Sequence, residues 1–431
     1  MPIAYCLIPN AYCLIPNPYN GGTAMSWVQV ECDREIHLNG SQGYLLLRDA
    51  RGDFSAWAGQ AACVYLDPPF MTGDDFFMRM RVGEKGWATG KNTLTLPAYQ
   101  DKFSGKAEFL RLVRAALENA KKLMNDTGSL FLHLDSRMAA HARLLCDDIF
   151  GESNFVNEII WAYQSGGRTM KRFSRKHDVI LFYRKSRNQY FDITAVPISR
   201  GENRSNHMRR SIDEQGRPYR SIRSGGKTYI YYDDDPVYPG DVWTDVSHLQ
   251  QKDPQRTGYD TQKPLALLKR IILSTTRKGD LVADLFGGSG TTAVAAAEEG
   301  RRFLSSDIGM LSLSVTRKRL LNTAMTVEAP CGAPGAAMEA EFAPGIAFHD
   351  AQLLDYQTPE GSPVTGLDAV DQWSVGFYRD RTFYVQANAA RTKHAPALQT
   401  MLQLPQLRGV PAVLVSDALG NRSVWIQEEN T

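Results

Sequence analysis

The sequence has 431 residues, of which 43% are apolar, and this length and composition predict a globular protein of two or three domains. Its six cysteines form no CxxC pair and no His/Cys ligand spacing, which argues against a zinc site and a secreted disulfide framework and favours a reducing cytoplasm. No apolar run reaches the roughly 18 residues of a membrane-spanning helix, and the formal net charge is only +2.

The N-terminus carries a tandem repeat, in which AYCLIPN at 4 to 10 recurs directly at 11 to 17. One seven-residue copy is too short to build a solenoid, so we interpret it as a duplication or cloning scar without chemistry. Residues 1 to 27 are therefore left out of the fold prediction as an N-terminal tail.

Short apolar runs alternate with longer amphipathic stretches between about residues 44 and 183. ACVYL (62 to 66) and GSLFLHL (128 to 134) are typical of buried strands, and helical patterns follow them in FLRLVRAALENAKKLM and RMAAHARLLCDDIF. DVILFY (178 to 183) predicts another strand. This alternation predicts a mostly parallel sheet with helices on both faces.

The alternation stops between about residues 184 and 258, where Arg, Gly, Asn, Ser and Tyr dominate and only short β-like runs such as KTYIYY occur. Residues 165 to 230 hold sixteen Lys and Arg against five acids, a net charge of +11 that leaves about −9 for the rest. Although a charge run is more often a solvated face, this concentration indicates a polyanionic partner, and nucleic acid is the obvious candidate.

Regular α/β patterns return at 262 to 325. They predict a helix through PLALLKRIILSTT, the strand LVADLF, a helix from residue 290 to about 299, the strand RFLSSDI and a helix over LSLSVTRKRLL. A stretch rich in Ala, Pro and Gly, at about 328 to 345, predicts a linker. The strand-like runs WSVGFY, TFYVQA, PAVLVS and SVWIQ then predict a small mixed or β-rich domain.

The strand at 62 to 66 runs directly into an acid and two prolines, in VYLDPPFMTG (64 to 73). Because Pro68 and Pro69 fix φ near −65° and donate no backbone hydrogen bond, Asp67 and Phe70 are expected on a rigid corner. A lone DPP tripeptide is more often a plain strand-ending turn. A functional interpretation of this corner therefore depends on the other motifs in the chain.

A glycine turn joins strand to helix in DLVADLFGGSGTTAVAAAEEGRRFLSSDIG. Its glycines let the backbone approach a ligand at a helix N-terminus, and Asp307 ends the next strand, where an acid commonly binds a ribose diol. The turn has no lysine, which argues against a triphosphate-binding loop, whereas Gly288, Gly290 and Ala293 satisfy G-x-G-x-x-A. This segment alone does not separate NAD from S-adenosylmethionine, or either from a structural turn.

The order of three motifs, DPPF, TQKP (261 to 264) and FGGSGTT (286 to 292), resembles the β class of DNA amino-methyltransferases over residues 44 to 325. The resemblance implies an α/β, Rossmann-like fold that binds S-adenosylmethionine and is circularly permuted, with the catalytic motif before the cofactor motif. The implied parts are a catalytic half (28–183), a basic target-recognition insertion (184–258), a cofactor-binding half (259–327) and a small C-terminal mixed or β-rich domain (346–431).

The resemblance also assigns roles to individual residues. The catalytic motif corresponds to Asp67, Pro68, Pro69 and Phe70. The implied cofactor site comprises Asp49, Lys263, Pro264, Asp284, Phe286, Gly288, Ser289, Gly290, Thr291 and Asp307. Relatives usually carry Gly-Asp at this place, whereas this chain has Arg48 before Asp49. Asp49 is therefore equally well interpreted as an acidic residue in a surface turn.

The implied reaction transfers methyl from S-adenosylmethionine to the N6 of a flipped adenine in double-stranded DNA, with S-adenosylhomocysteine as product and no metal. The Asp67 carboxylate and the Pro68 carbonyl would accept hydrogen bonds from the amino group, while Phe70 stacks on the base. Phosphate or base contacts are expected from Arg168, Lys171, Arg172, Arg204, Arg209 and Arg210. A cytoplasmic homodimer without membrane contact is also implied.

Several alternatives stay open. Transfer to the N4 of cytosine is the nearest, although those enzymes more often carry serine in place of Asp67. An NAD-binding oxidoreductase, a catalytically silent DNA-binding relative and an RNA substrate are the others. The domain after residue 345 either packs and supports a dimer or adds DNA contacts.

Overall fold

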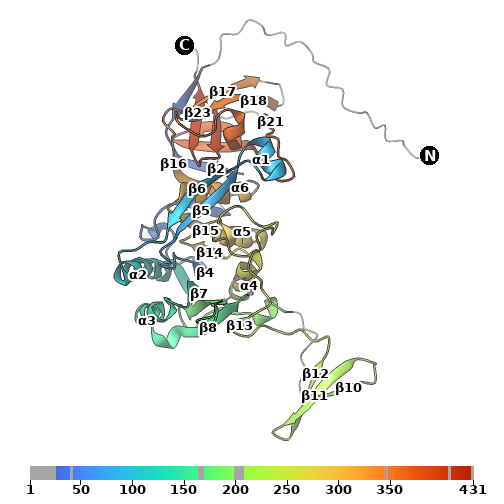
Figure 1. The fold of residues 1–431 in the computed structure, drawn as a ribbon. Coiled ribbons are helices and arrows are strands. Elements are labelled where there is room, and N and C mark those ends of the chain that lie inside the picture. Colours follow the sequence, from blue (N-terminus) through green and yellow to red (C-terminus); the bar gives the residue numbers. More distant parts are fainter. Residues whose placement is uncertain are drawn as a thin grey trace, which may run out of the picture.

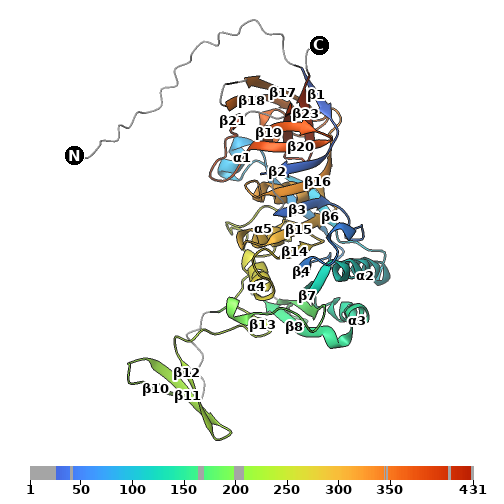
Figure 2. The same cartoon turned by 180° about the vertical axis from the view of Figure 1, so that it is seen from behind.

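The computed structural model describes residues 26–38, 42–163, 169–198, 208–343, 345, 348–405 and 409–428, and the repeated AYCLIPN segment lies outside them. A sheet of fifteen strands runs along the molecule from β13 at one end to β1 at the other (Figures 1 and 2). Helices cover its central part, and β-structure continues it at the end nearest the C-terminus.

The centre of the sheet is parallel. Its strands are, in spatial order, β16 (Met325–Cys331), β3 (Gly43–Leu47), β15 (Arg302–Asp307), β14 (Leu281–Asp284), β4 (Ala61–Leu66) and β7 (Met124–Asp135). Next come β9 (His177–Arg184) and β8 (Phe155–Ala162), both antiparallel to their inner neighbours, and the short β13 (Val242–Trp243). The chain leaves β14 toward β15 and leaves β4 toward β7, so the winding reverses between β14 and β4. Ligands of open α/β sheets bind at the carboxyl ends of strands at such a point.

Two helical layers enclose the parallel strands, as the sequence predicts. The helices are α2 (Lys106–Leu123) and α3 (Ala139–Phe150) on one face, with α4 (Leu265–Thr275), α5 (Thr291–Glu298) and α6 (Met310–Arg319) on the other. Strand β4 shows why both faces are needed: Val64 and Leu66 pack in one core, and Cys63 and Tyr65 in the other. A strand buried on both faces reads as a continuous apolar run, which is what ACVYL is.

A two-stranded hairpin follows the DPPF corner, and the sequence analysis did not predict it. It consists of β5 (Asp75–Arg81), the short α1 (Gly83–Thr89) and β6 (Thr93–Gln100). Its burial alternates from residue to residue, because one face packs inward and the other faces solvent. The Arg79 N–H donates to the Gly258 carbonyl at 2.9 Å, so the hairpin lies against the segment that precedes α4.

The basic insertion has three structurally different parts. Its first residues pack beside α4, where the Asp192 N–H donates to the Ser274 carbonyl at 2.7 Å. Strands β10 (Arg209–Ile212), β11 (Pro218–Ser224) and β12 (Lys227–Tyr232) then form a separate antiparallel sheet, called the arm here, that projects away from the body (Figures 1 and 2). The last part returns as β13, an edge strand paired with β8.

The end of the molecule nearest the C-terminus is built from β-structure, as predicted. Its strands in the main sheet are β1 (Trp27–Val30), β2 (Cys32–His37), β19 (Val370–Arg379), β20 (Thr382–Ala390), β22 (Val410–Asp417) and β23 (Arg422–Gln427). A second sheet holds β17 (Ala337–Ala343), β18 (Phe348–Gln357) and β21 (Met401–Pro405). Buried Trp373 and Tyr356 belong to the apolar core that these strands share.

Two features differ from the sequence-based expectation. The proposed linker at 328 to 345 contains the end of β16 and all of β17, because alternate residues of AMEAEFA face a core despite the Ala-rich composition. In addition, β1 pairs with β23, and β2 pairs with β20 as well as β16, although β2 and most of β1 lie in the range assigned to the catalytic half. Trp27, the first residue of β1, lies in the range assigned to the N-terminal tail, so the folded part begins before residue 28. Buried Glu35 of β2 accepts hydrogen bonds from Arg317 of α6 and from Arg422, which joins the two parts.

Candidate active site

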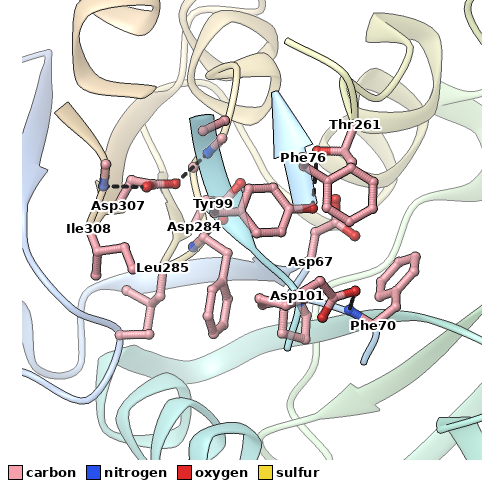
Figure 3. Close-up of a pocket in the computed structure, with 18 of the residues that line it drawn as sticks. Asp67, Phe70, Phe76, Tyr99, Asp101, Thr261, Asp284, Leu285, Asp307 and Ile308 are labelled. Atoms are coloured by element: carbon pink, nitrogen blue, oxygen red, sulfur yellow. Dashed lines mark hydrogen bonds between the residues drawn. The ribbon is translucent and has the colours of Figure 1, made fainter. Parts of the chain in front are cut away.

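The acid of DPPF and the glycine turn face one crevice. Strands β4 and β14 are neighbours in which Tyr65 pairs with Asp284, so Asp67 lies just beyond the carboxyl end of β4. A cavity of about 540 Å³ opens there, and its wall includes Asp67 and Phe70 (Figure 3). Gly288 of the glycine turn lines the same cavity. Segments that are far apart in the chain therefore meet at the point where the winding of the sheet reverses.

The two carboxylate oxygens of Asp67 have different surroundings. Oδ2 forms an ion pair with the Nζ of Lys263, whose ammonium group also lies 5.2 Å from the centroid of the Phe70 ring. Oδ1 is buried and accepts no hydrogen bond from the described residues. Lys263, which the resemblance assigned to the cofactor site, thus contacts the proposed catalytic acid and leaves one of its oxygens available.

Asp101 holds the backbone that follows the two prolines, and the sequence analysis missed it. Its buried carboxylate accepts the backbone N–H groups of Phe70 at 3.1 Å, Met71 at 2.7 Å and Thr72 at 2.9 Å. Met71 adopts a φ of 57°, an unusual conformation for a residue with a side chain. The single acid in AYQDKF gave no signal, because the hairpin that brings it to the corner was not foreseen.

A buried polar chain lies behind Phe70, whose ring is 5.9 Å from that of His133. One ring nitrogen of His133 is 2.7 Å from the Tyr65 hydroxyl, and the other is 3.2 Å from a carboxylate oxygen of Asp178. The Tyr163 hydroxyl donates to the second Asp178 oxygen at 3.0 Å. Burial opposes ionisation of Asp178, but hydrogen bonding and charge interaction with His133 outweigh it and lower the pKa of that carboxyl.

The glycine turn is held by its own backbone and by Asp307. The Gly290 N–H donates to the Gly287 carbonyl at 2.8 Å, and Asp307 accepts the N–H groups of Gly288 and Gly309, each at 2.8 Å. A Cβ at Gly290, where φ is 76°, would lie 2.4 Å from the Thr316 side chain, so only glycine fits. Burial raises the pKa of Asp307.

Asp284 is the second buried acid of the crevice. Burial raises its pKa to about 7, although hydrogen bonds from the Thr292 hydroxyl at 2.5 Å and the Phe286 N–H at 2.9 Å act in the opposite direction. Asp284 therefore titrates near neutral pH, unlike an ordinary aspartate.

The other residues assigned to the cofactor lie at different distances from the cavity. Asp49 lines it, but both of its oxygens are engaged by the Arg51 guanidinium at 2.9 and 2.6 Å, which lowers the pKa of Asp49. Pro68, Pro69, Phe286, Ser289 and Thr291 also line the wall. Of the described residues assigned there, Pro264 and Gly290 lie outside the wall, at the starts of α4 and α5.

Aromatic rings from three segments line the cavity near the glycine turn (Figure 3). Phe76 of β5 stacks on Tyr99 of β6 with 4.9 Å between the ring centroids, and Tyr99 stacks on Tyr259 with 6.4 Å between the centroids. The Tyr99 hydroxyl donates to the Thr261 hydroxyl at 3.5 Å. Sequence reasoning missed these rings because two of them belong to the unforeseen hairpin.

The predicted DNA contacts lie outside the crevice. Lys171 and Arg172 are exposed in the loop between β8 and β9, and Arg209 and Arg210 are exposed on the arm. Arg210 forms an ion pair with Asp233 at 3.1 Å, which offsets part of its charge. Arg168 and Arg204 lie outside the described residues.

Residues 61–315 match the family model described as DNA methylase, whose name, N6_N4_Mtase, covers both amino positions. The chain belongs to the N6/N4 DNA methylase family. This membership confirms the resemblance that DPPF, TQKP and FGGSGTT indicate. The parallel sheet, in which β4 precedes β14 in the chain and lies beside it, confirms the permuted Rossmann-like fold. It also favours methyl transfer over the oxidoreductase alternative.

Individual relatives of this chain are distant. The chain is 24% identical over 306 residues to the type II methyltransferase M.EcaI of Enterobacter cloacae, covering 60% of this chain and 64% of that protein. It is 26% identical over 214 residues to the DNA adenine methyltransferase YhdJ of Escherichia coli K12, covering 49% and 67%. The matches thus span about two thirds of the length of these relatives.

Solved structures give weaker matches to this chain. The cytosine-N4-specific PvuII DNA methyltransferase has a TM-score of 0.43 at 14% identity, covering 66% of this chain and 90% of that one. The complex of M1.HpyAVI with SAM has a TM-score of 0.39 at 16% identity, covering 64% and 98%. In the part of the chain that the structure describes, no helix has the length and apolar character for crossing a membrane.

Proposed function

We propose that this protein transfers a methyl group from S-adenosylmethionine to the exocyclic N6 of an adenine flipped out of double-stranded DNA. The observation that carries the proposal is the buried Oδ1 of Asp67, which has no hydrogen-bond partner among the described residues and lies beside the Pro68–Pro69 corner, in the same cavity as the glycine turn. A buried acceptor without a donor is costly in a folded protein, so a ligand N–H is its natural partner.

The corner suits an exocyclic amino group because it offers two acceptors on a fixed backbone. Asp67 Oδ1 and the Pro68 carbonyl would each accept one N–H, which draws the nitrogen toward tetrahedral geometry and frees its lone pair. The nitrogen would then be positioned to attack the sulfonium methyl that the bound cofactor supplies, with the neutral thioether as leaving group and the released proton passing to solvent. Positioning of the reactants governs such a displacement.

Lys263 prepares Asp67 for this role. Its ammonium group holds Oδ2 and thereby fixes the rotation of the carboxylate. The same ammonium group lies over the Phe70 ring. Stacking of a base on an aromatic ring contributes roughly 1 to 3 kcal/mol, and Phe70 provides that ring next to the corner.

The donor side of the cavity fits an adenosyl group. Asp307 has both oxygens fixed by backbone N–H groups, and each carboxylate oxygen retains capacity for another donor such as a ribose hydroxyl. The stacked rings of Phe76, Tyr99 and Tyr259 give the adjacent wall an apolar surface. When bound, S-adenosylmethionine supplies the electrophilic sulfonium methyl.

Two observations support adenine as the target base. The first motif position is an aspartate, whereas the enzymes that modify cytosine N4 more often carry serine there. In addition, the relative YhdJ is named a DNA adenine methyltransferase. The exocyclic amino group of cytosine is the competing target, because it offers the same two N–H groups to the same acceptors.

Deuterated methyl transfer tests the proposal. The purified chain is incubated with genomic DNA and methyl-deuterated S-adenosylmethionine, and the DNA is digested to nucleosides and analysed by mass. We expect labelled N6-methyladenine with the native chain and its formation to be at least about a hundredfold slower with Asp67→Asn. Labelled N4-methylcytosine would show that the target base is cytosine and not adenine. If the chain binds S-adenosylhomocysteine but yields no labelled nucleoside, the proposal is contradicted. The implied homodimer stays a prediction, which sedimentation of the same sample tests.

A further inference from the structure

Two apolar side chains stand entirely in solvent on the loop between β8 and β9, of which residues 169–176 are described. Met170 and Phe173 are each 99% exposed, more than any other large apolar side chain in the described part of the chain. Single exposed apolar residues are common, but two fully exposed ones within four positions of one loop are a feature of contact surfaces.

This loop emerges at the sheet edge that carries Asp67. Strand β7 is parallel to β4, with Leu66 opposite Leu132, and β9 is antiparallel to β7, with Asp135 opposite Asp178. The start of β9 and the end of β4 therefore lie at the same edge. Two strand spacings separate them, which is about 10 Å.

The base of the loop is closed and connected to the catalytic corner. The Tyr163 N–H donates to the Lys176 carbonyl at 2.9 Å, which brings the two ends of the loop together. The Tyr163 side chain bonds to Asp178, which contacts His133, and the ring of His133 lies 5.9 Å from that of Phe70. The loop is thus anchored beside the cavity while its tip remains in solvent.

The charges of the loop identify the kind of partner. Exposed Lys171, Arg172 and Arg175 alternate with Met170 and Phe173 along the sequence. A surface with cations on either side of apolar tips complements a polyanion with an apolar interior. A nucleic acid duplex is such a partner, since phosphates flank a stack of bases and apolar wedges can enter between base steps.

We infer, on the basis of the proposed function, that Met170 and Phe173 insert into the base stack beside the target and occupy the space left by the flipped base. Phe70 then stacks on the base inside the cavity, while the β8–β9 loop stabilises the duplex outside it. The two apolar side chains lower the cost of unpairing, and the neighbouring cations position the loop on the backbone.

The test compares paired and unpaired targets. The recognition site is first read by single-molecule sequencing of DNA from cells that express the protein. Two duplexes with this site are then prepared, one fully paired and one with an abasic position opposite the target base. We expect the double variant M170S/F173S to methylate the paired duplex about tenfold more slowly or worse, and the unpaired duplex within about twofold of the native rate.

A matched control is Leu144→Ser, which removes another exposed apolar side chain, 69% exposed, from α3. We expect it to act on both duplexes as the native chain does. Equal losses of M170S/F173S on both duplexes would overturn the wedge role, because the defect would then not depend on base pairing. Native rates on both would overturn it in favour of a protein-binding loop, and an inactive native chain would overturn the methyl-transfer proposal together with this inference.

Discussion

The catalytic crevice and the arm show opposite kinds of order. At the crevice, one buried carboxylate, Asp101, fixes three successive backbone N–H groups, and Lys263 fixes the orientation of Asp67. On the arm, Tyr229 and Ile230 lie exposed on a sheet of three strands that projects from the body. The groups of the crevice are thus held by internal hydrogen bonds and an ion pair, whereas apolar side chains of the arm remain exposed.

The difference follows from what each region does in the proposed function. Transfer of a methyl group depends on a geometry that is correct to a fraction of an ångström, so nearby side chains must hold each reacting group. Contacts with a nucleic acid backbone tolerate more variation, because they act largely through charge. Substitutions in the two regions should therefore change different measurable quantities.

The largest effect is expected for Asp67→Asn. The amide can accept one hydrogen bond, but it loses the ion pair with Lys263 and the charge that polarises the amino group. We expect the single-turnover rate of methyl transfer to fall by about 10²- to 10³-fold or more, with affinity for S-adenosylhomocysteine unchanged within about twofold. A variant that keeps its rate would remove Asp67 from the chemistry.

Asp284 should make stability depend on pH. Since its pKa is raised to about 7 by burial, the folded state binds more protons than the unfolded state between about pH 4 and pH 7, and stability falls as pH rises through that interval. In the native chain we expect the free energy of unfolding to fall by roughly 3 kcal/mol between pH 5 and pH 8, and we expect Asp284→Asn to remove this fall. Urea unfolding of both chains at pH 5 and pH 8 measures it, and identical pH dependence would contradict the assignment.

A smaller effect on catalysis is expected for Asp101→Asn. An amide cannot accept all three N–H groups that the carboxylate binds, so the segment from Phe70 to Thr72 should loosen. We expect kcat to fall by about 10- to 100-fold, while KM for S-adenosylmethionine changes little. The exposed neighbour Asp74→Asn is the control, and a KM effect without a kcat effect would argue against a positioning role.

The smallest effects are expected on the arm. Arg209→Gln should lower the slope of log affinity for DNA against log salt by about 0.9 if the side chain neutralises one phosphate. Arg210→Gln should change the slope less, because Asp233 already pairs with that guanidinium at 3.1 Å. Equal changes for the two variants, or none, would show that the ion pair does not decide which arginine binds.

The sequence predicted the parts of the fold that have strong local periodicity. ACVYL and LVADLF became β4 and β14, and the helices on either face followed their apolar patterns. Contacts between segments far apart could not be predicted in this way. The pairing of Lys263 with Asp67 joins residues 196 positions apart, and β1 pairs with β23 at the other end of the chain.

The proposed site was predictable to the extent that its residues form motifs. Asp67 and the glycine turn stand in DPPF and FGGSG, and they do share a cavity. Asp101 acts through hydrogen bonds to the backbone of the DPPF corner, and His133 acts through a hydrogen bond to Tyr65 and a ring contact with Phe70, so their position in the sequence carries no pattern of its own. The fully exposed Met170 and Phe173 were equally hidden, because exposure is a property of the folded chain.

A crystal structure of the protein with S-adenosylhomocysteine would test most directly whether one crevice serves both the methyl donor and the acceptor base. We expect the ribose hydroxyls at Asp307, the adenine beside the stacked rings and the homocysteine sulfur facing Asp67. An adenosyl group bound outside this cavity, or a sulfur turned away from Asp67 with the DPPF corner closed off, would contradict the proposed reaction.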